Sequence, residues 1–116
     1  MNSNECCFGI EKLLEPEVFK ALSDPNRVAI LAKLSQGSPD QSVAEVATCC
    51  PIDLSVVSRH LKILKDAGVV EAHKQGKSVL YRLRTTEIVT MLRNIADALE
   101  ACCPKGMCET VGGLDE

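Results

Sequence analysis

The sequence predicts a mainly α-helical fold with one β-hairpin, arranged as a winged helix-turn-helix. Two segments with apolar residues at helical spacing are joined by the short connection "PID" at residues 51–53, which is typical of a helix-turn-helix. The alternating segment "VVEAHKQGKSVLYRLR" at 69–84 predicts two strands joined by a tight turn, which form the wing. With 116 residues, the chain is expected to form a single domain over 1–116.

The helices are predicted from apolar spacing and from the signals at their ends. Residues 16–37 are expected to form one or two helices interrupted at Pro25. The helix-turn-helix is expected at about 42–67, with Asp53 as the cap of its second helix and Gly68 as its end. The buried face of this second helix would comprise Val57, Leu61 and Leu64.

The wing is expected at about 69–84, and a terminal helix is predicted at about 86–103, followed by a tail at 104–116. The terminal helix has a broad apolar stripe that nothing later in the chain can cover. It must either fold back on the core or pack against its copy, and a homodimer is favoured. The predicted dimer interface comprises Ile88, Leu92, Ile95 and Leu99.

The charge of the chain is distributed unevenly. Between Arg59 and Arg84 there are seven Lys or Arg residues against Asp66 and Glu71, a net charge of +5 within a chain whose net charge is −3. A basic segment inside an acidic protein suits a polyanionic partner, although a charged run by itself is more often a solvated face.

Double-stranded DNA is the expected partner of this basic segment. The start of the second helix of a helix-turn-helix enters the major groove, where short polar side chains and arginine approach base edges. The tip of a wing contacts phosphates or the minor groove. The predicted contacts are Ser55, Val56, Ser58, Arg59, His60 and Lys62 on the helix and Lys74, Gln75, Lys77 and Ser78 on the wing.

The two histidines of the chain, His60 and His73, admit a second interpretation as metal ligands. Imidazole ligands usually have companions at nearby spacing, and neither histidine has one. Helix packing or backbone contact is therefore favoured for His60, and an ordinary strand position for His73.

Three segments resemble the ArsR/SmtB family of winged-helix repressors: "FKALSDPNRVAILAKL", "LSVVSRHLKILKDAGVV" and "KQGKSVLYRL". Together they cover about residues 18–84 in the family's order. The resemblance implies a homodimer built on the first and last helices. It also implies that the dimer binds an operator of inverted symmetry and releases it when a metal, metalloid or redox signal arrives.

Two inducer sites of the family are missing from this sequence. The Cys-x-Cys that the best-known arsenic-sensing members carry on the first helix of the helix-turn-helix appears here as Ser42 and Ala44. Zinc-sensing members carry Asp, His and Glu ligands along the terminal helix, but residues 85–100 contain no histidine. An inducer of this chain would therefore use other residues.

The cysteine content favours metal, metalloid or redox chemistry. The start of the chain has no secretory pattern and no apolar stretch approaches about 20 residues, so the protein is expected in the cytoplasm, without a membrane span and with reduced thiols. The seven cysteines are an odd number and include three adjacent pairs. Adjacent cysteines are poor disulfide partners, so a disulfide framework is not expected.

Cys102, Cys103 and Cys108 are the predicted metal or metalloid ligands. The first two continue the apolar face of the terminal helix beyond Leu99, and Pro104 stops the helix so that the third can turn back toward them. Three thiolates without a fourth ligand suit As(III) or Sb(III), inorganic or methylated, with cadmium, lead or copper(I) as alternatives. Some arsenic-responsive family members resemble this chain in carrying such a cluster at this place. No organic cofactor is expected.

The remaining cysteines are alternative or additional ligands. Cys6 and Cys7 lie in an N-terminal "ECC" that resembles a site of some relatives, so they would form a second site or join the first across the dimer. Cys49 and Cys50 are favoured as packing residues, because free cysteine is readily buried. As ligands they would connect directly to the turn before the recognition helix.

The expected function is repression of a metalloid-resistance operon, with release from the operator when As(III) or Sb(III) binds the three thiolates. The alternative is a repressor of the same fold that senses another soft metal or the redox or persulfide state of its thiols. An enzyme is disfavoured, because no Cys-x-x-Cys follows a strand in a βαβ unit and no acid, base and nucleophile group together.

Overall fold

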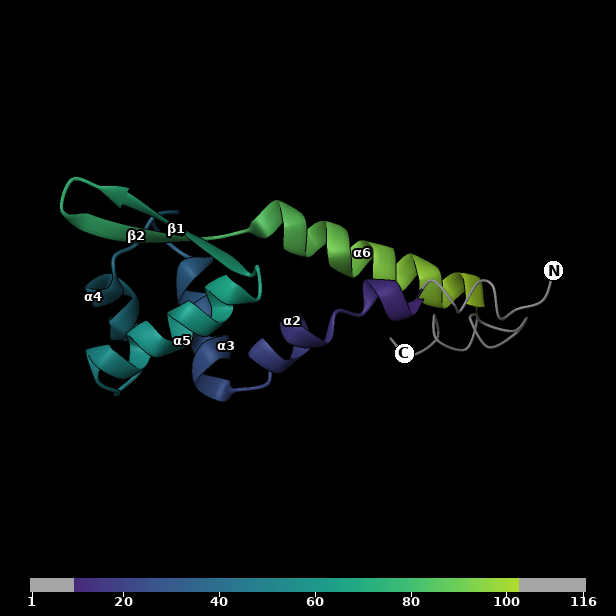
Figure 1. The fold of residues 1–116 in the computed structure, drawn as a ribbon, viewed down its shortest axis with the longest axis horizontal. Helices are drawn as coiled ribbons and strands as arrows, with labels where there is room; N and C mark the ends of the chain where they lie inside the picture. The colour runs from purple at the N-terminus through teal and green to yellow at the C-terminus, as the bar shows by residue number, and fades with distance from the viewer. Residues whose placement is uncertain (1–9, 103–116) are drawn as a thin grey trace. The chain divides into compact units, whose positions relative to one another are not determined.

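The structure, a computed structural model, describes residues 10–102 (Figure 1). The chain divides into two compact units, and their described parts are Pro16–Glu87 and a second unit formed by residues 10–15 with residues 88–102. The predicted ligands Cys6, Cys7, Cys103 and Cys108 lie outside the described residues, as does the side chain of Cys102.

Two helices, α2 (Pro16–Ala21) and α3 (Pro25–Leu34), form the first part of the larger unit. Pro25 begins α3 rather than only interrupting a helix, because Asp24 precedes it as the N-cap. Asp24 Oδ1 accepts hydrogen bonds from the backbone N–H groups of Asn26 at 2.8 Å and Arg27 at 3.3 Å. A capping carboxylate followed by proline satisfies N–H groups that the first turn leaves without helical partners.

The helix-turn-helix begins with α4 (Val43–Val46), which continues into the short 3-10 helix η1 (Ala47–Cys49). Ser42 and Glu45 form a capping box at the start of α4. The Ser42 hydroxyl accepts a hydrogen bond from the Glu45 N–H at 3.2 Å, and the Glu45 carboxylate accepts one from the Ser42 N–H at 2.8 Å. This reciprocal pair fixes where the first helix of the motif starts.

The second helix of the motif is α5 (Leu54–Asp66). Asp53 occupies its N-cap position as predicted, but the Asp53 side chain makes no capping hydrogen bond, which corrects that part of the prediction. The backbone carbonyl of Asp53 instead accepts hydrogen bonds from the N–H groups of Val56 and Val57, both at 3.0 Å. The extended backbone at Asp53 is thus what starts the helix.

The end of α5 is a glycine-dependent turn. The N–H of Val69 donates to the Leu64 carbonyl at 2.9 Å and the N–H of Gly68 to the Lys65 carbonyl at 3.0 Å. Gly68 has a φ of 83°, which side chains other than glycine rarely adopt. This pattern closes the helix and turns the chain directly into the wing.

The core of the larger unit lies beneath α5. The predicted buried residues Val57, Leu61 and Leu64 all have 0% of their surface exposed. Ile30 of α3 and Val46 of α4 are also fully buried, and α5 contacts both of these helices and the wing. Because this face of α5 is committed to the core, the opposite face must point outward.

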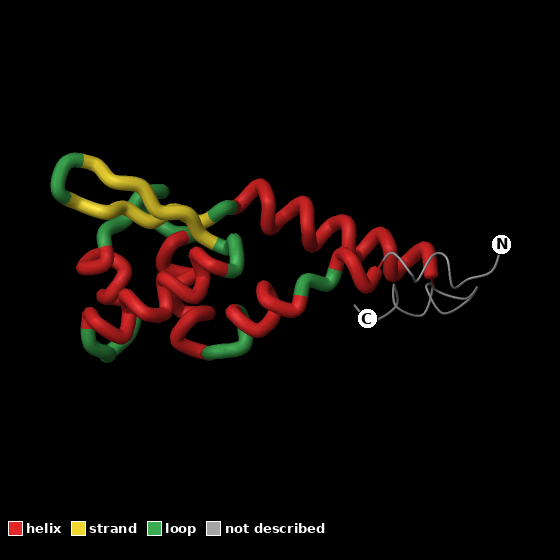
Figure 2. The backbone as a smooth tube through the Cα atoms, viewed as in Figure 1, coloured by secondary structure: helices red, strands yellow, loops and turns green. Residues whose placement is uncertain are grey.

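The wing is an antiparallel hairpin of β1 (Val70–Gln75) and β2 (Ser78–Leu83) (Figure 2). Gln75 pairs with Ser78 across a two-residue turn, and Gly76 at the first turn position has a φ of 66°. A glycine with positive φ at this position matches the twist that two antiparallel strands need. The mainly α-helical fold with a β-hairpin wing, predicted from the sequence, is confirmed.

The base of the wing is tied to the loop before α4. Gln41 and Tyr81 form an isolated antiparallel bridge, in which each backbone N–H donates to the other carbonyl, at 3.0 Å and 2.7 Å. The buried Gln41 amide also donates to the carbonyl of Lys33 in the last turn of α3 and to those of Gln36 and Ser38 in the loop after it, each at 3.0 Å. These bonds hold β2 in a defined position relative to the helix-turn-helix.

The last helix is α6 (Thr85–Cys102), which begins two residues after the wing. From Ile88 onward it belongs to the smaller unit, together with the N-terminal segment, in which residues 10–13 are helical. None of the described helices is long and apolar enough to cross a membrane.

Candidate nucleic-acid interface

The outward face of α5 forms one side of an open cleft, which we call the recognition cleft. Four of the predicted DNA contacts on α5 line this cleft. The last three follow Ser55 by three, four and seven residues, so all four share one face of the helix. All of them are exposed. The recognition cleft has a volume of about 500 Å³ and is lined by Ser55, Ser58, Arg59, Lys62, Lys65 and Tyr81.

Lys65 and Tyr81 were missing from the predicted contacts. Lys65 follows Lys62 by three residues and Ser58 by seven, so helical spacing from these predicted contacts is a signal that finds it. Tyr81 has no such signal, because it reaches the cleft from β2 and its position depends on the bridge to Gln41.

The chemistry of the recognition cleft suits a nucleic acid. It presents two short hydroxyl side chains, one guanidinium, two ammonium groups and a phenol. Hydroxyls and a guanidinium hydrogen-bond to base edges, whereas ammonium groups contact phosphates without sequence preference. Lys62 also forms an exposed ion pair with Asp66, with Nζ to Oδ2 at 3.0 Å, and a phosphate would compete for this contact.

Val56 and His60, the other two predicted contacts on α5, do not line the recognition cleft. Both are half-buried. His60 Nδ1 lies 3.2 Å from Arg27 Nη1, so the imidazole contacts α3 rather than the cleft. This placement agrees with the packing interpretation that the sequence favoured for His60.

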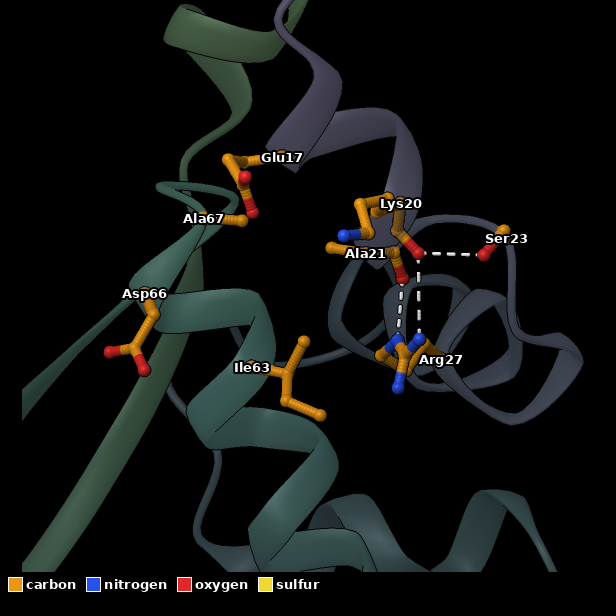
Figure 3. A pocket seen from close by; sticks show the side chains of 8 residues that line it. All are labelled: Glu17, Lys20, Ala21, Ser23, Arg27, Ile63, Asp66 and Ala67. Carbon is orange, nitrogen blue, oxygen red and sulfur yellow. Dashed lines mark hydrogen bonds between the residues drawn. The ribbon is translucent and has the colours of Figure 1, made fainter.

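Arg27 also lines a second open pocket, between α2, the turn after it and the C-terminal half of α5 (Figure 3). The Arg27 guanidinium donates from Nε to the Ala21 carbonyl at 2.6 Å and from Nη2 to the Lys20 carbonyl at 3.5 Å. The pocket measures about 390 Å³, and its lining includes Glu17 and Asp66 beside these cations. Mixed charge makes this pocket a poor site for a polyanion.

The tip of the wing is a second basic surface. Lys74, Gln75, Lys77 and Ser78 are all exposed on either side of the turn at Gly76. Their exposure suits the predicted contacts with phosphates or the minor groove.

An ion pair stands at the base of the wing. Arg82 donates from Nε and Nη2 to the two carboxylate oxygens of Asp40, at 2.8 Å and 3.0 Å. The hydrogen bonds from Arg82, followed by burial that acts in the opposite direction, leave the pKa of Asp40 below its usual value. His73 Nε2 lies 3.9 Å from Asp40 Oδ1, so protonated His73 would add to this attraction. His73 therefore stands on β1 beside a carboxylate, with no group of metal ligands around it in the part of the chain described.

The structure places only some of the predicted thiol ligands. Cys49 ends η1 and Cys50 follows it; both are half-buried rather than buried, and their sulfur atoms are paired as a disulfide. This pairing differs from the expectation that adjacent cysteines do not pair. Cys102 is the last residue of α6. Within residues 10–102, no group of three or more His, Cys, Asp or Glu side chains is arranged to hold a metal ion.

The predicted dimer residues lie along α6. Leu92 and Leu99 are 49% and 50% exposed, and Ile88 is half-buried. Ile95 is 8% exposed, so a single chain already buries it. Val89, next to this stripe, is 40% exposed. An apolar surface of this kind on one helix is typical of a protein contact.

Comparison with known proteins identifies a family. Residues 22–73 match the model of a helix-turn-helix domain. The transcriptional repressor SdpR of Bacillus subtilis is 42% identical over 60% of this chain and 74% of its own length. The HTH-type transcriptional repressor SmtB of Mycobacterium tuberculosis is also 42% identical, over 58% of this chain and 48% of its own length. The cadmium resistance regulatory protein CadC of Listeria innocua is 35% identical over 64% of this chain and 61% of its own length.

Solved structures agree with these relatives. An ArsR-like transcriptional regulator from Rhodococcus sp. RHA1 is 36% identical, with a TM-score of 0.61 over 70% of this chain and 74% of that one. The homodimeric winged helix-turn-helix DNA-binding domain of Mb0332 from Mycobacterium bovis is 27% identical, with a TM-score of 0.58 over 84% of this chain and 88% of that one. All of these similar proteins are described as regulators or DNA-binding domains and none as an enzyme, which agrees with the prediction of a non-enzyme.

Proposed function

Because this chain belongs to the ArsR/SmtB family of winged-helix transcriptional regulators, we propose that it is a cytoplasmic repressor that binds double-stranded operator DNA as a homodimer. The observation that carries this proposal is the recognition cleft, in which four predicted DNA contacts of α5 converge with Lys65 and Tyr81. The exposed basic tip of the wing supplies further phosphate contacts. The exposed Leu92 and Leu99 of α6 support the dimer, with Ile88 and Ile95 on the same stripe.

We further propose that As(III) or Sb(III) releases the repressor by binding Cys102, Cys103 and Cys108. Support comes from the expected dimerisation helix α6, whose last residue is Cys102. All three thiols lie within seven residues of sequence. Three thiolates suit a soft trivalent ion that completes its coordination with three sulfur ligands.

The alternative inducer is a different soft ion in place of As(III) or Sb(III). Cadmium is favoured among these alternatives by one observation, the 35% identity to a relative named for cadmium resistance. Lead, copper(I) and a redox or persulfide signal remain in the same class, because each acts on thiolates. Cys6, Cys7, Cys49 and Cys50 are the further thiols on which such a signal would act.

Release follows as a population shift between two dimer arrangements. One arrangement spaces the two recognition helices for successive major grooves, about 34 Å apart, and the other does not. An inducer that binds the second arrangement better lowers operator affinity, with a typical coupling of about 1–3 kcal/mol. Operator DNA must then weaken inducer binding by the same factor, because thermodynamic coupling is reciprocal.

The test is operator binding titrated with trivalent arsenite for the unmodified protein and for C102S/C103S. The unmodified protein is expected to lose operator affinity as arsenite is added, and C102S/C103S is expected to stay bound. C6S/C7S is the matched control at another adjacent pair. Retained release in C102S/C103S would contradict the assigned ligands, and a repressor that cadmium releases but arsenite does not would favour the alternative.

A further inference from the structure

We propose that Cys49 and Cys50 form a second thiol site, which captures a trivalent arsenical that carries one carbon substituent. Its effect on DNA binding rests on the proposed function, but the capture of the arsenical does not. The site differs from the C-terminal cluster in its number of thiols and in its place in the fold, since it lies within the helix-turn-helix itself.

The position of the pair connects it to α5. The N–H of Cys50 donates to the Ala47 carbonyl at 3.3 Å, and the Cys50 carbonyl accepts from the Ile52 N–H at 2.9 Å. Two residues then lead to Asp53, the N-cap of α5. The Cys50 backbone is thus bonded on both sides within the turn that sets where the recognition helix begins.

Cys49 and Cys50 are adjacent, and both are partly exposed. Cys49 and Cys50 are half-buried, and the structure brings their sulfur atoms together. The unit of residues 16–87 contains no other cysteine. Among the residues that the structure describes, no third His, Cys, Asp or Glu side chain joins them in a metal-binding group. Within residues 10–102 the pair therefore offers two sulfur ligands and no third ligand.

Two thiols select the class of ligand. A bare soft ion that takes three or four protein ligands would remain incompletely bound here. An arsenical of the form R–As(OH)₂ supplies one of the three bonds of arsenic itself, through carbon. It needs two thiolates and no more, and sulfur ligands that are already adjacent cost little ordering on binding.

The capture reaction is an exchange of ligands. The paired sulfurs are first reduced by a monothiol, two molecules of which form one disulfide while Cys49 and Cys50 each gain a hydrogen. Each thiol then replaces one hydroxide on arsenic. Two As–O bonds break, two As–S bonds form, and the two thiol protons leave in two water molecules. Arsenic remains trivalent throughout.

An arsenic atom bonded to both sulfurs would restrain the backbone at Cys50. Because this backbone is hydrogen-bonded to Ala47 and Ile52, the restraint would extend to the turn before α5. We expect bound arsenical to lower operator affinity at least about fivefold, the lower end of ordinary coupling between two sites. Inorganic arsenite is expected to bind this pair poorly, since it brings no carbon substituent.

The experiment uses phenylarsine oxide with the full chain under a phosphine reductant. The variant C6S/C7S/C102S/C103S/C108S keeps only the pair, and mass spectrometry of the intact protein is expected to show one phenylarsenic per chain. Adding C50S leaves one thiol and is expected to abolish stable uptake. Operator affinity is measured for each variant with and without the probe, so that release is scored against that variant's own baseline.

Equal uptake by the one-thiol and two-thiol variants would overturn the proposed capture, and uptake that leaves operator affinity unchanged would overturn its proposed effect on DNA binding. If the five-serine variant does not fold, C49S/C50S in the otherwise unmodified chain tests the same point, because its uptake should fall by one phenylarsenic. C49S/C50S should still respond to arsenite. Loss of that response would contradict the C-terminal ligand assignment rather than the capture of phenylarsine oxide.

Discussion

Arg82 on β2 donates two hydrogen bonds, of 2.8 Å and 3.0 Å, to the carboxylate of Asp40, which lies 42 residues earlier in the sequence. The carboxylate belongs to the loop before α4, so the pair joins the base of the wing to the start of the helix-turn-helix. Glu71 on β1 lies 4.0 Å from the same guanidinium. The orientation of the wing relative to α5 therefore depends partly on a surface charge pair.

The first prediction concerns the strength of this pair. The side chains of Arg82 and Asp40 are 46% and 28% exposed, so solvent screens much of their attraction. A double-mutant cycle with R82Q and D40N is expected to give a small stabilising coupling in urea unfolding. The pair Lys62 and Asp66, 73% and 62% exposed, is the control and should couple less. A value near zero for Arg82 and Asp40 would show that this ion pair does not stabilise the fold.

The second prediction concerns acid. Hydrogen bonds from Arg82 leave the pKa of Asp40 below its usual value of 3.8. At Asp24, burial acts to raise the pKa, but hydrogen bonds from the Asn26 and Arg27 N–H groups and the nearby charges of His60 and Arg27 together leave the pKa of that carboxyl below its usual value. A carboxyl whose pKa is lower in the folded state stabilises the fold above its unfolded pKa and loses that contribution as the pH falls.

We therefore expect the free energy of unfolding to fall as the pH drops from about 5 to 2, more steeply for the unmodified protein than for D24N/D40N. Urea unfolding followed by circular dichroism at a series of pH values measures both slopes. Coinciding slopes would mean that these two carboxylates do not carry the acid sensitivity.

The third prediction concerns DNA. Arg59 lines the recognition cleft, so R59A is expected to weaken operator binding and to reduce the slope of log affinity against log salt by about one if Arg59 contacts a phosphate. If Arg59 reads a base instead, R59A should cost about 1–3 kcal/mol for the operator and change little for unrelated DNA. R93A, an exposed arginine on α6, is the control, and its binding should match that of the unmodified protein.

The fourth prediction concerns the core. Leu61 and Ile63 are two residues apart on α5, but Leu61 is 0% exposed and Ile63 is 43% exposed. L61A is expected to lower the free energy of unfolding by about 2–5 kcal/mol, because it leaves a cavity. I63A should cost under about 1 kcal/mol, as surface changes usually do. Similar losses in the two variants would contradict the assignment of the buried face.

Periodicity made the buried face of α5 predictable from the sequence. Val57, Leu61 and Leu64 recur at helical spacing, and a helix that packs on one side buries such a stripe. Gly68 was also predictable as the helix end, because few other residues adopt its backbone conformation. The capping role of Asp24 was not predicted. Proline interrupts a helix that precedes it but is also favoured in the first turn of a new one, and here Pro25 begins α3.

The remainder depended on contacts between distant residues. Tyr81 enters the recognition cleft because Gln41 pairs with it 40 residues earlier in the chain, and no local pattern encodes that bridge. His60 was among the predicted DNA contacts because of its position in the recognition helix. In the structure its Nδ1 lies 3.2 Å from Nη1 of Arg27 on α3. The predicted inducer thiols Cys103 and Cys108 lie outside the described residues, so they stay predictions.

Gln41 also determines where this protein tolerates changes in length. Its side-chain amide nitrogen makes the length of the loop after α3 important. It donates hydrogen bonds to the carbonyls of Lys33, Gln36 and Ser38, each at 3.0 Å. An inserted residue in that loop would move at least one carbonyl out of reach and shift β2 with it. The turn at Gly76 has open space around it, since a Cβ there would meet nothing within 4 Å, but its φ of 66° favours glycine and its neighbours are proposed DNA contacts. Hybrids with other family members should therefore be joined outside residues 33–41, and the tip of the hairpin should be left unchanged where DNA binding is to be kept.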